Sequence, residues 1–175
     1  MVNEKRLNSS PQHSLLAKIF HWGFVVLFLY GILKQVDSIS ELADIALLRF
    51  ELLFAFVLIV LLAARFIYMR KTQTSSLPKE TSALQKLLAK LVHLAMYLAL
   101  ASIALSGILI GLLYWMGMKS GLFIRLVVNV HEVSVTACYW LIGLHVAAAV
   151  FHRFKNDGVW SSMVPFWRET ETEKA

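Results

Sequence analysis

The histidines of this sequence are the side chains whose type and spacing could bind a metal or transfer protons. The chain has six histidines, and five of them fall within or at the ends of long apolar runs: His21, His93, His131, His145 and His152. The sixth, His13, lies in a polar segment, and we assign it no role. An ionisable side chain inside a membrane is costly, so a functional role is its default interpretation. At about 100° per residue, the spacing of the last three places them on one stripe of a helix.

The depths of these histidines separate them into two groups. The helical rise from His131 to His145 is about 21 Å, so the two lie toward opposite leaflets and one metal centre cannot use both. His21 begins the first apolar run and His93 lies early in the third, so both share a leaflet with His145. A noncovalent haem between helices needs two imidazoles that face each other. His21 with His145 meets this requirement, and His93 with His145 is the competing pair.

Two other interpretations of these residues stay open. A membrane histidine often only makes a hydrogen bond to a neighbouring helix, and His93 could instead contact a haem propionate or a quinone.

The single cysteine, Cys138, excludes an internal disulfide, a four-cysteine metal site and the covalent attachment of a c-type haem. Any haem is therefore held noncovalently.

The composition of the chain predicts which secondary structure must hold these side chains. The chain has 175 residues, of which 58% are hydrophobic and 16% charged, and its mean hydropathy is +0.66. This is far more apolar than an ordinary soluble domain. Apolar runs cover about 17–36, 45–69, 84–118 and 122–154. We therefore predict an all-α membrane protein, an up-and-down bundle of four transmembrane helices that forms one membrane domain over residues 1–175, with an uncleaved first helix.

Positive charges predict the orientation of this bundle. The net charge of +6 is interpreted as a topological signal and not as a nucleic-acid surface. Lysines and arginines flank the first span, the polar loop after the second and the end of the fourth: Lys5, Arg6, Lys18, Arg65, Arg70, Lys71, Lys79, Lys86, Lys90, Arg153, Lys155 and Arg168. We therefore expect both termini to be cytoplasmic.

Several stretches of the sequence resemble the bacterial cytochrome b561 family, which is related to the b-type cytochrome subunits of nickel-iron hydrogenases. They are Phe20-His21-Trp22, Ala64-Arg65, His93 with Tyr97, His131-Glu132, and the run from Gly143 to Ala149 with His152. The resemblance implies a bacterial inner-membrane protein with two b haems, one toward each leaflet, that passes electrons between quinones and another donor or acceptor. It also implies that His21 and His145 are iron ligands on the cytoplasmic side and that His131 is a ligand on the other.

The second span departs from this pattern. The resemblance places the partner of His131 at Glu51, 14 residues before Arg65, and no histidine occurs between His21 and His93. Three outcomes stay open: the second haem is absent, His131 binds it with one open or water-filled position, or Met116 or Met118 completes the site. We favour absence or abnormal ligation.

Glu51 and a group of basic residues each have two interpretations, and a third set has one. Glu51 could pair with His131 or Arg125 and take part in proton uptake beside a quinone, or it could sit at the water interface near Arg49. Arg65, Lys18 and Lys90 could neutralise haem propionates, or they could be flanking positive charges. The neighbourhood of His93, His152 and Lys90 is our choice for a quinone site.

These observations predict an integral-membrane b-type cytochrome that carries electrons between the quinone pool and a redox partner. No glycine-rich flavin or nucleotide loop is visible, so a primary dehydrogenase would be a separate subunit. Membrane lipid is the other expected contact, and a homodimer stays open. One alternative is an oxidase of superoxide that reduces ubiquinone, which would need a basic funnel near Lys119 and Arg125. The other is a haem-free membrane histidine protein.

Overall fold

The computed structural model describes residues 13–36, 38–72, 75, 77–78 and 80–169. Lys5, Arg6 and Lys79 lie outside these ranges. The helices, in chain order, are α1 (Leu15–Leu33), the short 3-10 helix η2 (Ile39–Ala43), α2 (Ile45–Thr72), α3 (Ala83–Trp115), α4 (Leu122–Lys155) and α5 (Val159–Met163). Within the described residues the chain is helical and has no β-strand.

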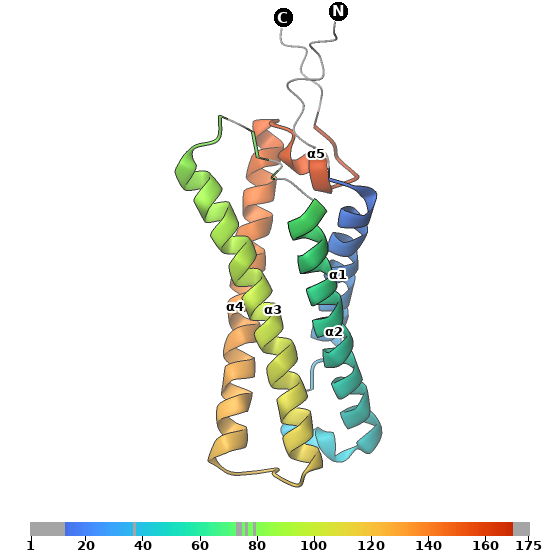
Figure 1. Cartoon of the computed structure of the whole chain (residues 1–175). Helices are drawn as coiled ribbons and strands as arrows, with labels where there is room; N and C mark the ends of the chain where they lie inside the picture. Colours follow the sequence, from blue (N-terminus) through green and yellow to red (C-terminus); the bar gives the residue numbers. More distant parts are fainter. Residues whose placement is uncertain (1–12, 37, 73–74, 76, 79, 170–175) are drawn as a thin grey trace, which may run out of the picture.

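Four of these helices, α1 to α4, are long and apolar enough to cross a membrane. They pack as an up-and-down bundle, which confirms the predicted fold class (Figure 1). The start of α1, the end of α2, the start of α3 and the end of α4 lie at one end beside α5, which we call the α5 end. The opposite end, called the η2 end, carries η2 and the turn between α3 and α4.

Local sequence signals explain where the helices begin and end. The Ser14 hydroxyl accepts a hydrogen bond from the Ala17 N–H at 3.2 Å, and Ser82 caps α3 in the same way. Such caps satisfy N–H groups that have no partner within the helix. Asn156 ends α4 in the left-handed conformation with φ of 57°.

The helices pack through small residues, as expected between membrane helices. A Cβ atom added to Gly111 of α3 would lie 2.6 Å from Cδ2 of Leu52 in α2, so the Leu52 side chain can hold its place against α3 because the residue is glycine. One turn earlier, Gly107 faces the ring of His131 from α4. The seam between α2, α3 and α4 is therefore tight in the half toward the η2 end.

Apolar side chains cover the outside of the bundle as well as its core. The largest buried cluster lies midway along the helices and contains Phe24, Leu58, Leu62, Leu100, Ala104 and Cys138. On the outer surface Trp140 is 79% exposed and Phe154 is 73% exposed. An apolar exterior on helices of this length is the arrangement that lipid stabilises.

Candidate functional site

Three of the predicted histidines meet at the α5 end of the bundle. The rings of His21 from α1 and His145 from α4 have centroids 6.2 Å apart, with 57° between their planes. His93 from α3 also contacts His145, with ring centroids 5.1 Å apart and planes nearly perpendicular at 82°. The structure thus brings together the three side chains whose depths matched in the sequence.

The two pairs of histidine rings differ in whether a metal ion fits between them. A metal–imidazole bond is about 2 Å, so two imidazoles that ligate one iron from opposite sides have ring centroids about 6 Å apart. The His21 and His145 rings are spaced at that distance. The His93 and His145 rings are closer than this and meet edge to face. The arrangement is therefore compatible with one ion between His21 and His145.

The backbone determines which nitrogen of His93 carries the proton. Its Nδ1 lies 2.6 Å from the carbonyl oxygen of Ala89. A carbonyl only accepts hydrogen bonds, so Nδ1–H is the donor and Nε2 keeps a lone pair. His93 can therefore accept a proton or a hydrogen bond through Nε2.

Arg65 adds α2 to the three helices that supply the grouped histidines. Its guanidinium lies 5.4 Å from the ring centroid of Phe24 and 5.6 Å from that of Tyr97. The buried Nε of Arg65 has no hydrogen-bond partner within the described part of the chain. Because buried donors in native proteins are normally paired, this N–H fits an acceptor that the described residues do not supply.

His131 lies apart from this group, in the half of the bundle toward the η2 end. Its Nδ1 is 2.9 Å from the hydroxyl of Ser106 in α3. The Ser106 hydroxyl donates its one hydrogen to the carbonyl of Ser102 at 2.5 Å, so it accepts the bond from His131. Ser102 in turn lies 2.7 Å from Ser134, which links α3 to α4 again. The sequence interpretation did not include Ser106, although a serine on the facing helix at matched depth is the available signal.

Other candidates for the second site do not gather around His131. Glu51 is half-buried, and among the described residues no hydrogen bond or ion pair joins it to His131 or to Arg125. Met116 is 63% exposed and Met118 is 44% exposed, both at the end of α3. The described residues also contain no group of three or more His, Cys, Asp or Glu side chains that could hold a metal ion.

The chain matches the family model for prokaryotic cytochrome b561 over residues 12–166. It belongs to the prokaryotic cytochrome b561 family. No curated protein and no solved structure matches it. Membership identifies a multi-pass bacterial membrane protein that binds b-type haem and takes part in electron transfer, and it confirms the family resemblance carried by the histidine positions.

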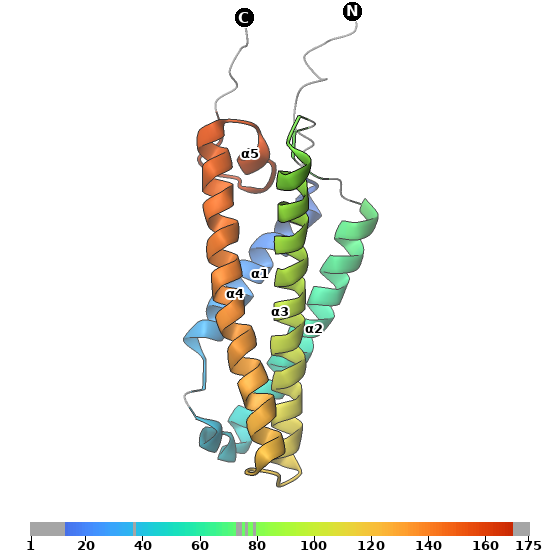
Figure 2. The same cartoon turned by 90° about the vertical axis from the view of Figure 1, so that its left-hand side faces the viewer.

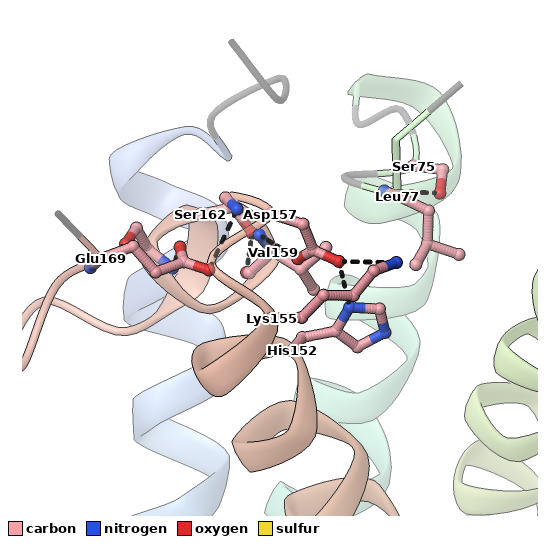
Figure 3. A network of polar contacts seen from close by, with 10 residues as sticks. Ser75, Leu77, His152, Lys155, Asp157, Val159, Ser162 and Glu169 are labelled. Atoms are coloured by element: carbon pink, nitrogen blue, oxygen red, sulfur yellow. Dashed lines mark hydrogen bonds and ion pairs between the residues drawn. The ribbon is translucent and has the colours of Figure 1, made fainter. Parts of the chain in front are cut away.

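In this cytochrome His152 lies nearer to the α5 end than the three grouped histidines. Its Nδ1 is 2.7 Å from Oδ2 of Asp157, and Lys155 Nζ is 3.4 Å from the same oxygen (Figure 3). The other oxygen of Asp157 accepts a hydrogen bond from the Val159 N–H at 3.4 Å. His152 is therefore paired with Asp157, a partner that the sequence interpretation missed.

The cytochrome has a cavity of about 500 Å³ at the α5 end of α3, beside the loop between α2 and α3. Lys86, Ala89 and Lys90 line it together with Ser75 and Leu77. Ala89 is the residue whose carbonyl accepts from His93. The cavity therefore lies one helical turn from His93. A second cavity of about 300 Å³ lies at the η2 end, with Lys119, Arg125 and Glu132 among its lining residues.

Proposed function

We propose that this chain is an electron carrier with one b haem, held between His21 and His145 and exchanging electrons between a quinone and a redox partner. The observation that carries the proposal is the pair of imidazoles whose ring centroids lie 6.2 Å apart. Two helices that are far apart in the chain supply them, as haem ligation within a helix bundle requires.

The surroundings of this pair fit a haem. The buried N–H of Arg65 lacks an acceptor among the described residues, and haem carries carboxylates that would supply one. The haem contributes one-electron chemistry when bound. The chain contributes the ligands, the apolar enclosure and the positive charge of Arg65, which together tune the reduction potential.

His93 has a different role in this proposal. Its ring is too close to His145 for the two to ligate one iron from opposite sides. Its Nε2 lone pair, held in place by the hydrogen bond to Ala89, is suited to accept a proton when a quinol is oxidised. The neighbouring cavity of about 500 Å³ is large enough for a quinone head, and Lys90 from its lining and His152 complete the proposed quinone neighbourhood.

A second haem does not fit the half of the bundle toward the η2 end. His131 is the only one of the chain's six histidines in that half, so no second imidazole is available there to complete a pair of ligands. Glu51 stands where the resemblance places a histidine. We therefore propose one haem for each chain and assign His131 no iron.

One haem leaves much of the roughly 30 Å hydrocarbon thickness without a redox centre. A partner subunit would then supply the next cofactor, since no glycine-rich nucleotide loop occurs in this sequence. In this proposal the α5 end lies on the cytoplasmic side of the bacterial inner membrane and both termini are cytoplasmic, and the positive residues around that end support this orientation.

A second candidate function has one observation in its favour. The cavity of about 300 Å³ at the η2 end is lined by Lys119 and Arg125, so it could attract an anion such as superoxide from the other side of the membrane. In this candidate the electron passes to ubiquinone. The electron carrier is favoured because the histidine rings that lie close to one another are all at the opposite end of the bundle.

The haem content of the purified protein tests the proposal. A pyridine haemochrome assay should give about one haem per chain for the wild type and for His131→Ala, and far less for His21→Ala. His93→Ala should keep the low-spin absorption spectrum of a haem with two imidazole ligands. Two haems, one of which is lost with His131, would contradict the single site. No haem in the wild type would instead support the haem-free membrane histidine protein.

A further inference from the structure

We propose that residues 156–169 form a clamp that joins α1 to α4 and thereby positions His21 opposite His145. The inference rests on the proposed haem site. It assigns a positioning role to Trp22 and Glu169, which act through the histidines and not on the haem itself.

The packing of α1 shows why such a clamp is needed. The closest backbone packing of α1 is with α2, whereas α3 packs on both α2 and α4, and α4 packs on α5. Figure 2 shows α1 running obliquely across the pair formed by α3 and α4. The rings of Phe28 and Tyr139 meet at 5.9 Å and connect α1 to α4 deeper in the bundle. At the α5 end, the connection passes through the clamp.

Trp22 makes this connection from the residue next to His21. Its Nε1–H donates to the carbonyl of Met163 at 3.3 Å, and its ring lies 5.5 Å from that of Phe166. The same indole meets the His21 imidazole edge to face at 5.7 Å. A shift of Trp22 therefore moves His21 relative to α4.

Glu169 holds the clamp in shape. One carboxylate oxygen accepts from the Gly158 N–H at 3.0 Å, and the other accepts from the Ser161 N–H at 3.1 Å. The Glu169 N–H donates back to the Ser161 hydroxyl at 2.9 Å. These N–H groups at the start of α5 have no acceptor within that helix. The carboxylate thus closes residues 158–169 into a loop that carries Met163 and Phe166 to Trp22.

Two contacts attach the closed loop to α4. Asp157 accepts from His152 at 2.7 Å, and Figure 3 shows this pair beside the hydrogen bonds of the loop. The Nε–H of Arg153 donates to the carbonyl of Trp167 at 2.7 Å. Because α4 also carries His145, the clamp links both proposed ligand helices at the end where their imidazoles meet. Holding two ligands at a fixed separation slows the release of what they bind.

The test measures how fast the haem-loaded protein gives up its haem to an excess of apomyoglobin. Trp22→Phe keeps an aromatic ring but loses the N–H donor, and Glu169→Gln loses the charge and one acceptor. We expect each variant to release haem about tenfold faster than the wild type, which corresponds to about 1.4 kcal/mol. The low-spin spectrum should also weaken, which a purely structural contact far from the site would not cause.

Matched controls come from the rest of the chain. Trp140→Phe alters a tryptophan that is 79% exposed on the outside of α4. Glu41→Gln weakens a carboxylate that accepts from the Ser38 N–H at 2.9 Å, at the η2 end. Both should release haem within twofold of the wild-type rate. Clamp variants that also stay within twofold would overturn the inference, whereas a His21→Ala protein that keeps its haem would overturn the site on which it rests.

Discussion

Replacement of Arg65 by methionine should affect the haem-free and the haem-loaded protein differently. In the structure the guanidinium contacts two aromatic rings, and its buried Nε lacks a partner within the described chain. Methionine fills a similar volume without donors or charge. In the haem-free protein, the variant therefore removes both the cost of the unpaired Nε–H and the favourable contacts with the two rings. In the haem-loaded protein the Nε–H has an acceptor, so the variant removes only favourable interactions.

The magnitudes follow from these contacts. Each cation–π contact contributes about 0.5–2 kcal/mol, and an unsatisfied buried donor costs about 1–3 kcal/mol. The two contacts together oppose this cost, and the middles of the two ranges nearly cancel, so the free energy of unfolding of the haem-free protein should change little and at most by about 3 kcal/mol. A hydrogen bond from Arg65 to a haem carboxylate would contribute about 1.5–3 kcal/mol. Its loss should raise the haem dissociation constant by about 10- to 150-fold.

The assay is titration of haem into the haem-free protein in detergent, together with thermal unfolding of the haem-free and haem-loaded forms. Arg49→Met is the control, because Arg49 is exposed on the same helix at the η2 end. The control should leave both the dissociation constant and the melting temperatures unchanged. An unchanged haem affinity for Arg65→Met would refute the assignment of its buried N–H to a haem carboxylate.

Three further substitutions test the packing and the role of His131. Gly111→Ala should lower the melting temperature, because overpacking against Leu52 costs about 1–3 kcal/mol and exceeds the roughly 1 kcal/mol gained in helix propensity. Gly31→Ala, whose Cβ would lie 3.5 Å from Phe54, should be neutral or stabilising in the same melt; the reverse order would contradict the close approach of α2 and α3. Ser106→Ala should destabilise the protein by about 0.5–1.5 kcal/mol, the contribution of one hydrogen bond, because the backbone carbonyl of Ile103 still accepts from His131, yet leave haem per chain unchanged. Loss of haem from this variant would argue that His131 is an iron ligand.

The sequence alone predicted much of the fold. Runs of about 20 apolar residues specify membrane helices by themselves, because lipid offers the backbone no hydrogen-bond partners. The predicted spans matched α1 to α4 to within a few residues; the third was expected to reach residue 118, but α3 ends at Trp115. The positions of His21, His93 and His145 within their apolar runs also predicted that the three share a leaflet.

Only the tertiary structure decided how those side chains relate across helices. Periodicity fixes the face and the depth of a residue, but the rotation and tilt of each helix depend on contacts between distant segments, such as Gly111 with Leu52. For this reason the sequence left His21 and His93 as competing partners of His145, and the ring spacings favour His21. The hydrogen bond between His131 and Ser106 and the clamp over Trp22 likewise depend on residues 25 and 141 positions apart, respectively, which no local pattern connects.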